Sequence, residues 1–95
     1  MNDEVTLTID RAGNKFYHNA DDDLHRVDGP AIEFINGNRS WYLAGKRHRA
    51  DGPAFIWLNG KSIEWWLNGI HYKTPEEMPF ELFVAYMKWR ANNEK

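Results

Sequence analysis

Short runs of alternating apolar and polar residues, separated by glycine-containing turns, cover the first three quarters of the chain. In residues 5–9 apolar side chains alternate with threonine, the period of two that is typical of a half-buried strand. Gly13-Asn14 follows as a turn, and residues 15–18 are expected to return as the second strand of a degenerate hairpin. Residues 19–23 are polar and acidic without periodicity, which predicts an exposed loop.

Two further hairpins are predicted around Asn-Gly pairs, because asparagine and glycine best tolerate the positive φ angles of a type I′ turn. The strands are residues 31–35 and 39–43 around Asn36-Gly37, and residues 54–58 and 62–67 around Asn59-Gly60. The turn glycine lies four positions before the first aromatic residue in the earlier hairpin and five positions before it in the later one. An extra residue on one strand reverses the facing of its neighbours, so we expect a bulge near Ile63 or Glu64.

The pattern changes to a helical period after the third hairpin. Thr74 can cap, Pro75 suits the first helical position and Glu77 completes a capping box, so a helical segment is predicted over residues 74–92. Its main part is expected between Pro79 and Ala91. The stripe expected to pack on the sheet is Phe80, Phe83, Val84, Met87 and Ala91. The apolar residues left outside this stripe are Leu82, Tyr86 and Trp89, which form either additional core or, as we expect, an interface.

These elements predict a mainly β, α+β fold in which three successive antiparallel β-hairpins form one twisted sheet closed by a C-terminal helix. One domain, residues 1–95, is expected. It comprises the degenerate hairpin and acidic loop (1–23), two hairpin repeats (24–72) and the helix (74–92).

The composition indicates which classes of protein fit the chain. Fourteen aromatic residues, five of them tryptophan, can build a core without disulfides, and the chain has no cysteine. No apolar run reaches the length of a membrane span, so we expect a soluble, cytoplasmic protein without a membrane partner. The net charge is −2, but residues 1–23 are acidic and residues 24–49 are basic.

One heptapeptide recurs: residues 25–31, His-Arg-Val-Asp-Gly-Pro-Ala, return as residues 48–54, His-Arg-Ala-Asp-Gly-Pro-Ala. Histidine and aspartate are suitable acid-base groups or metal ligands. An active site needs its groups to converge once, however, whereas a structural corner recurs with each repeat. We therefore predict no catalytic residue, no metal site and no cofactor. The expected structural corner residues are His25, Arg26, Asp28, Gly29, Pro30, Asp51, Gly52 and Pro53.

Across residues 16–72 the chain resembles a group of repeat proteins built from Leu-His-Arg-x-Asp-Gly-Pro-Ala, a hairpin turn and Trp-Tyr-x-Asn-Gly. Those proteins are frequent in bacteriophages, large viruses and bacteria and have no known general activity. In spacing they are similar to hairpin repeats of the membrane-occupation-and-recognition-nexus type. The second copy departs from the pattern, since Arg47 stands where Leu24 precedes the first. The resemblance implies a scaffold and, by analogy, a phage origin, for which the host cytoplasm is the expected location.

The function expected from these features is a non-enzymatic protein-binding module, and by analogy a phage-encoded inhibitor of a host enzyme or defence factor. Homo-oligomers are a further expectation for open repeats. Single-stranded nucleic-acid binding through the basic, aromatic central hairpin is the alternative, and a small hydrolase using histidine and aspartate is the third reading. The residues predicted to bind a partner are Arg39, Trp41, Lys46, Arg47, His48, Arg49, Leu82, Tyr86 and Trp89.

Overall fold

The computed structural model describes residues 4–57 and 60–93, so Leu58 and Asn59 of the predicted third hairpin lie outside it. The elements are β1 (Thr6–Ile9), β2 (Lys15–His18), β3 (Ile32–Glu33), β4 (Arg39–Ser40), β5 (Tyr42–Leu43), β6 (Lys46–Arg47), β7 (Phe55–Trp57), β8 (Ser62–Leu67), β9 (Ile70–Tyr72), the 3-10 turn η1 (Pro75–Glu77) and the helix α1 (Phe80–Asn93).

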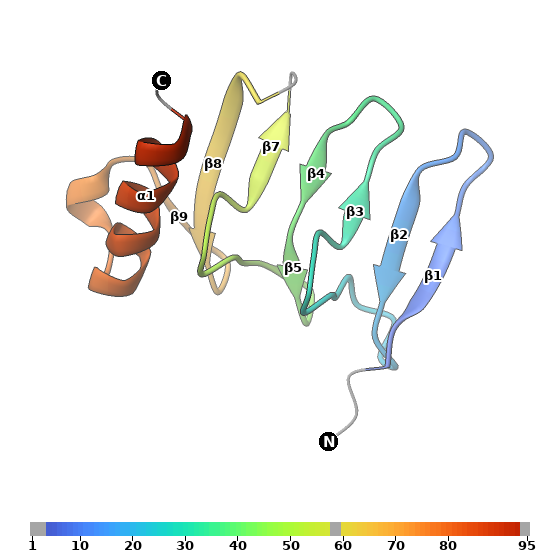
Figure 1. Cartoon of the computed structure of the whole chain (residues 1–95). Helices are drawn as coiled ribbons and strands as arrows, with labels where there is room; N and C mark the ends of the chain where they lie inside the picture. Colours follow the sequence, from blue (N-terminus) through green and yellow to red (C-terminus); the bar gives the residue numbers. More distant parts are fainter. Residues whose placement is uncertain (1–3, 58–59, 94–95) are drawn as a thin grey trace.

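Seven of these strands form one antiparallel sheet in the order β1-β2-β3-β4-β7-β8-β9 (Figure 1). The three predicted hairpins are β1–β2, β3–β4 and β7–β8, placed side by side, and α1 follows at the far end from β1. The mainly β fold with a C-terminal helix is therefore confirmed. A separate pair, β5–β6, projects between the second and third hairpins.

The turn at Asn36-Gly37 is not of type I′. Only Gly37 has a positive φ there, 94°, in a three-residue loop that Asn38 closes by accepting a hydrogen bond from Phe34. Positive φ at both central residues, as type I′ requires, occurs instead at Ala44-Gly45 and Asn68-Gly69. These two pairs make the tight connections β5–β6 and β8–β9.

The predicted bulge near Ile63 or Glu64 is wrong. Pairing runs without interruption from Phe55 opposite Glu64 to Trp57 opposite Ser62. The extra residue instead falls between the paired strands, because four residues separate Trp57 from Ser62 whereas three separate Phe34 from Asn38. A longer turn leaves the facing of the paired residues unchanged, so it is the less disruptive way to absorb an insertion.

The opposite side of α1 from the predicted one packs on the sheet. Leu82 is fully buried and Ala85 is 9% exposed, whereas Phe80 is 81% and Met87 47% exposed. The inner stripe is Leu82, Ala85, Tyr86 and Trp89, which has the same i, i+3, i+4, i+7 spacing as the predicted stripe. Periodicity alone could not choose between the two, and the choice follows from the contacts with Trp65 described below.

The predicted helical start at Thr74 is a separate 3-10 turn. Thr74 makes no capping hydrogen bond through its side chain, and α1 begins only after Pro79. The predicted capping box does not form, because Glu77 Oε1 accepts a hydrogen bond at 3.0 Å from the N–H of Lys73, the residue before Thr74, and not from that of Thr74.

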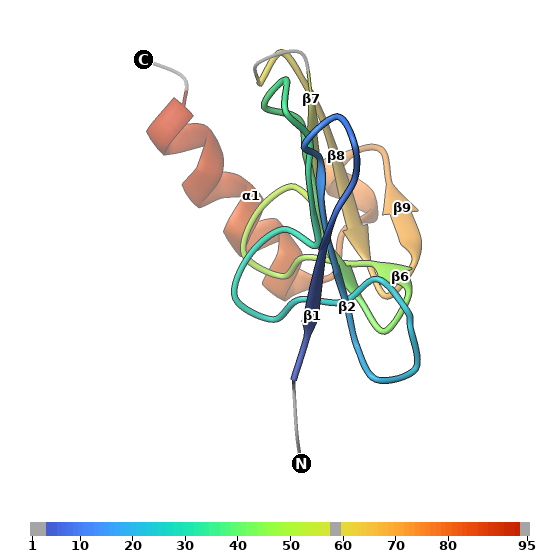
Figure 2. The ribbon, with the colours of Figure 1, turned by 90° about the vertical axis from the view of Figure 1, so that its right-hand side faces the viewer.

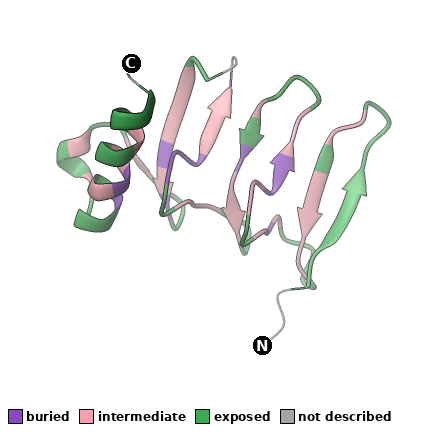
Figure 3. Ribbon diagram, in the orientation of Figure 1, coloured by how far each residue is buried: buried purple, intermediate pink, exposed green. Residues whose placement is uncertain are grey.

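The strand register shows which side chains share a face of the sheet. Arg39 pairs with Ile56, and Ile56 with Ile63, so these side chains share a face with Trp41 and Trp65, each two positions along its strand. We call this the helix face, because α1 packs on Trp65. Figure 2 shows α1 on one side of the sheet, with the loops 26–30 and 49–53. Buried residues lie in β3, β4 and β8, in the corner segments that precede β3 and β7, and on the sheet-facing side of α1 (Figure 3). The hydrophobic cluster of buried residues joins β8 to α1, so it lies at the C-terminal end of the sheet.

Candidate functional site

Each recurrent heptapeptide forms a corner held by its arginine. In the second copy the Arg49 guanidinium carbon lies 4.0 Å from the centroid of the Trp41 ring. Its Nε is 2.9 Å from Asp51 Oδ1, and its Nη1 donates to the Pro53 carbonyl at 3.1 Å. The arginine therefore joins an aromatic residue of its own hairpin to the loop that follows it, by a cation–π contact and charge-assisted hydrogen bonds.

The first copy repeats this arrangement. Arg26 lies 4.0 Å from the centroid of the Tyr17 ring, approaches Asp28 Oδ1 at 3.3 Å and donates to the Pro30 carbonyl at 3.1 Å. It also reaches Glu33 Oε2 at 3.4 Å. The recurrence supports the structural role predicted for these residues.

The corner glycines are needed for close approach and not for an unusual backbone angle. Neither Gly29 nor Gly52 has a positive φ, the usual reason for a glycine at a corner. A β-carbon at Gly52 would lie 2.7 Å from the guanidinium carbon of Arg49, and one at Gly29 would lie 3.1 Å from that of Arg26. The side chain of the arginine covers the glycine in each corner, so any larger residue would displace it.

The corner histidines join one repeat to the next. His25 Nδ1 accepts a hydrogen bond from the Ala44 N–H at 2.9 Å, and His48 Nδ1 accepts one from the Asn68 N–H at 2.9 Å. Ala44 and Asn68 are the equivalent residues of the two tight turns. Because a ring nitrogen that accepts must be unprotonated, this nitrogen carries no proton in either histidine. His48 therefore has a structural role, which the sequence had predicted for His25 alone.

The third hairpin has no corner arginine, and α1 takes its place. Trp65 occupies the position of Trp41 in the preceding hairpin. Instead of a guanidinium, its ring meets Tyr86 at 5.5 Å and Trp89 at 6.0 Å between centroids, both edge to face. The helix therefore caps the row of aromatic residues on the helix face.

A groove of about 430 Å³ lies between this face and the C-terminal part of α1. We call it the helix groove. Arg39, Trp41 and Ile56 line it from the sheet, and Trp89 lines it from the helix. The complete lining is Arg39, Trp41, Arg49, Ile56, Gly60, Trp89 and Asn93.

Arg39 is the group in this groove that is available to a partner. Its side chain makes no hydrogen bond or ion pair within residues 4–57 and 60–93. Glu33, directly opposite Arg39 in the strand register, instead forms an ion pair with Arg26 at 3.4 Å. The groove thus combines an uncommitted cation with aromatic and apolar walls.

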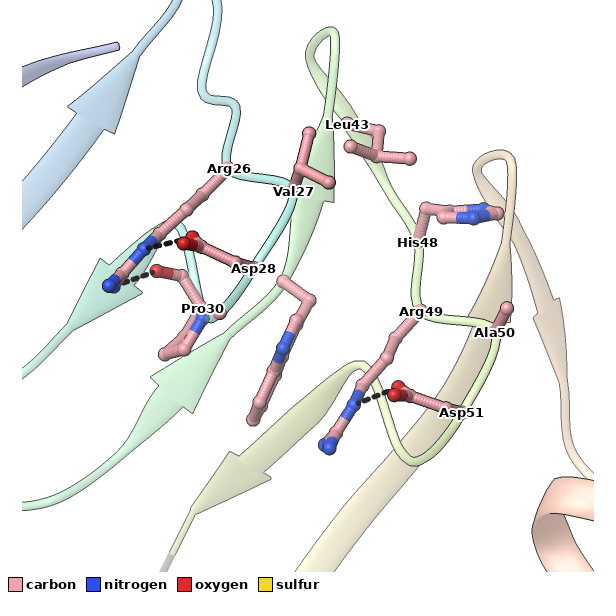
Figure 4. A pocket seen from close by; sticks show the side chains of 11 residues that line it. Arg26, Val27, Asp28, Pro30, Leu43, His48, Arg49, Ala50 and Asp51 are labelled. Carbon is pink, nitrogen blue, oxygen red and sulfur yellow. Dashed lines mark hydrogen bonds and ion pairs between the residues drawn. The ribbon is translucent and has the colours of Figure 1, made fainter. Parts of the chain in front are cut away.

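A larger hollow of about 630 Å³ lies between the two corners (Figure 4). Its charged groups already bind one another, since Arg26 and Arg49 form ion pairs with Asp28 and Asp51. Figure 4 shows the His48 ring apart from both carboxylates, and its Nδ1 is hydrogen bonded to Asn68. The pairing of His48 with a carboxylate that a hydrolase would use is not assembled among the described residues.

Four residues predicted to bind a partner meet in the helix groove: Arg39, Trp41, Arg49 and Trp89. Arg47 does not join them. It lies on the opposite face, 4.6 Å from the Phe55 ring centroid, and its Nη1 is 3.3 Å from Glu64 Oε1. This guanidinium packs against the sheet and does not contribute to the helix groove, so partner binding by Arg47 stays a prediction.

The remaining predicted residues also lie elsewhere. Lys46 is exposed on β6, with its side chain near Gly69. Leu82 is fully buried, so the prediction that it forms an exposed interface is wrong. Tyr86 is half-buried against the core and does not line the groove. Sequence reasoning missed Ile56 and Asn93 in the groove. Ile56 could have been found from the strand register, because it pairs with Arg39.

Within the described ranges no group of three or more His, Cys, Asp or Glu side chains is arranged to hold a metal ion. The helices described in the chain are too short or too polar to cross a membrane. No protein-family model matches the chain, and neither curated proteins nor solved structures give a significant match.

Proposed function

We propose that this chain is a non-enzymatic protein-binding module whose helix groove binds an acidic segment of a partner protein that also carries an apolar or aromatic side chain. The observation that carries this proposal is the uncommitted guanidinium of Arg39 beside Trp41 and Trp89. Arginine and tryptophan are the residue types most often responsible for binding energy at protein interfaces.

The chemistry of the groove favours a carboxylate-bearing ligand. A guanidinium binds a carboxylate through two parallel hydrogen bonds, and the walls formed by Ile56 and Trp89 offer apolar surface beside it. The ligand is a protein and not a polyanion, because the net charge is −2 and six acidic residues precede the first corner. Inhibition of a host enzyme or defence factor is the biological role that we propose for this binding, and its support is the resemblance to phage repeat proteins.

Selection from a displayed peptide library tests the proposal. We expect wild-type protein to enrich peptides that combine Asp or Glu with an aromatic residue, and the Arg39→Glu variant to lose them. Titrating a selected peptide should shift the amide resonances of Trp41 and Trp89. The side-chain signals of these two residues should move with them.

The matched control is Arg11→Glu, which changes the net charge equally in the turn of the first hairpin, remote from the groove. It should enrich the same peptides as the wild type. Enrichment of basic peptides, resonance shifts confined to the opposite face, or tighter and steeply salt-dependent binding to an oligonucleotide would refute the proposal, the last in favour of a nucleic-acid function.

A further inference from the structure

Strand β1 forms an uncovered edge of the sheet. It pairs with β2 on one side, and on its other side the described part of the chain places no element (Figure 1). The strand at the other edge, β9, continues directly into η1 and α1. The two ends of the repeat array therefore differ, because α1 follows β9 whereas no described element lies beside the outer edge of β1.

The main-chain groups of Leu7 point to this open edge. The Tyr17 N–H donates to the Ala31 carbonyl at 2.8 Å, so the backbone of Tyr17 faces β3 and not β1. Leu7, directly opposite Tyr17, is consequently in a non-hydrogen-bonded pair, and its N–H and C=O face outward. The same alternation directs the backbone N–H and C=O groups of Ile9 outward. The edge thus offers regularly spaced donors and acceptors to another strand.

The sequence of this edge is nearly palindromic. Residues 5–9 read Val-Thr-Leu-Thr-Ile, centred on Leu7. Antiparallel pairing of two such strands about Leu7 places Val5 opposite Ile9 and Thr6 opposite Thr8 of the second copy. In this register every outward-facing backbone group meets a partner, apolar residues meet on one face and threonines on the other.

The exposed side chains agree with this register. Val5, Leu7 and Ile9 are 39%, 45% and 55% exposed, and all three lie on the same face. Lysine, proline and bulges, which commonly protect edge strands, are absent from residues 5–9.

Carboxylates flank the strand and limit its length. The register would place Glu4 opposite Asp10 of the second copy, a pair of like charges at each end of the ladder. The Asp10 carboxylate is, however, engaged in its own turn, where Oδ1 accepts from the N–H groups of Ala12, Gly13 and Asn14. These charges keep the association weak and prevent the pairing from extending past Glu4 and Asp10.

We propose that a second copy of this chain pairs with the first through antiparallel β1–β1 contact about Leu7, giving a twofold-symmetric dimer with one continuous sheet. The same patch of each copy forms the contact, so the assembly is closed and does not propagate into a fibre. This surface is separate from the helix groove, so this inference and the proposed peptide binding can fail independently.

The first test is the mass of the full chain in solution over a series from micromolar to millimolar concentration, by sedimentation equilibrium. Wild-type protein should shift toward twice the monomer mass. Leu7→Lys, which opposes two like charges on the symmetry axis, should stay monomeric with an unchanged near-ultraviolet circular dichroism spectrum. Ile70→Lys, at an exposed apolar position on β9 at the other edge, should dimerise like the wild type.

The second test is register-specific and does not depend on Leu7→Lys folding correctly. The chain has no cysteine, so Leu7→Cys introduces a single thiol. In the proposed register the two Cα atoms at position 7 are about 5.5 Å apart, which suits a disulfide. Mild oxidation should therefore cross-link Leu7→Cys at least several-fold faster than Ile70→Cys.

Three results would overturn the inference: wild-type protein that is monomeric throughout the series, dimers that persist in Leu7→Lys, or equal cross-linking of the two cysteine variants. A chain that stayed monomeric but captured a strand of an unrelated protein at β1 would overturn it as well.

Discussion

Gly52 illustrates how a contact, and not a backbone angle, fixes a repeated residue. Its φ is not positive, yet a β-carbon there would come within 2.7 Å of the Arg49 guanidinium. The sequence indicated that glycine belongs to a corner, and that was right in outcome. It could not indicate the reason, because the contact depends on a side chain three positions earlier folding back over the loop.

We predict that Gly52→Ala destabilises the fold by about 1 to 2 kcal/mol, because the displaced guanidinium loses its bonds to Asp51 and Pro53. Gly29→Ala should destabilise the fold less, because a β-carbon there would lie 3.1 Å from the guanidinium carbon of Arg26. Chemical denaturation of both variants measures this. In an Arg49→Met background the cost of Gly52→Ala should largely disappear, and additive costs would show that the guanidinium is not responsible.

A second residue-scale prediction concerns Asp10. Hydrogen bonding from the Asn14 side chain and from three backbone N–H groups lowers the pKa of this carboxyl group. A group whose pKa is lower in the folded state contributes stability above its unfolded-state pKa and loses it as the pH falls through the folded-state pKa. Wild-type protein should therefore be more stable than Asp10→Asn at neutral pH, and acidification should narrow the difference. Denaturation midpoints measured across the acidic range test this, and parallel pH profiles for the two proteins would contradict it.

At the scale of elements, the strands of the three hairpins were predictable, whereas the β5–β6 pair, β9 and the orientation of α1 were not. Alternation and turn residues located β1, β2 and the later hairpins, because a period of two and glycine-containing turns are local properties. The side of α1 that packs was missed, because two stripes of equal spacing compete in one sequence. The tertiary contact of Tyr86 and Trp89 with Trp65 decides between them.

The orientation of α1 predicts unequal effects of two similar substitutions. Leu82→Ala should destabilise the protein by about 3 kcal/mol, because it leaves a cavity at a fully buried site. Met87→Ala, on the outward side and 47% exposed, should change the free energy of unfolding by less than about 0.5 kcal/mol. Both substitutions introduce alanine in the middle of α1, so helix propensity does not explain a difference between their effects on stability. Equal losses in thermal or chemical denaturation would mean that both sides of α1 are packed.

At the scale of the whole molecule, the repeated residues and the binding residues are largely distinct, although Trp41 and Arg49 belong both to the second corner and to the wall of the groove. His25 and His48 connect successive repeats, and the corner arginines hold each loop on its own hairpin. The helix groove, by contrast, occurs once, where α1 replaces the missing third corner. Part of its lining was predicted from basic and aromatic residues. The rest needed the strand register and the helix orientation, which periodicity does not provide.

Calorimetric titration of a library-selected acidic peptide into two variants shows whether the groove or the corners bind it. Arg39→Glu should weaken binding by about tenfold or more, the loss expected for a charge-assisted hydrogen bond, while the free energy of unfolding stays unchanged. His48→Ala should lower the stability by about 1 kcal/mol, because the Asn68 N–H loses its acceptor, and should bind the peptide with wild-type affinity. Wild-type affinity in Arg39→Glu together with lost binding in folded His48→Ala would show that the repeated corners, and not the helix groove, bind the peptide.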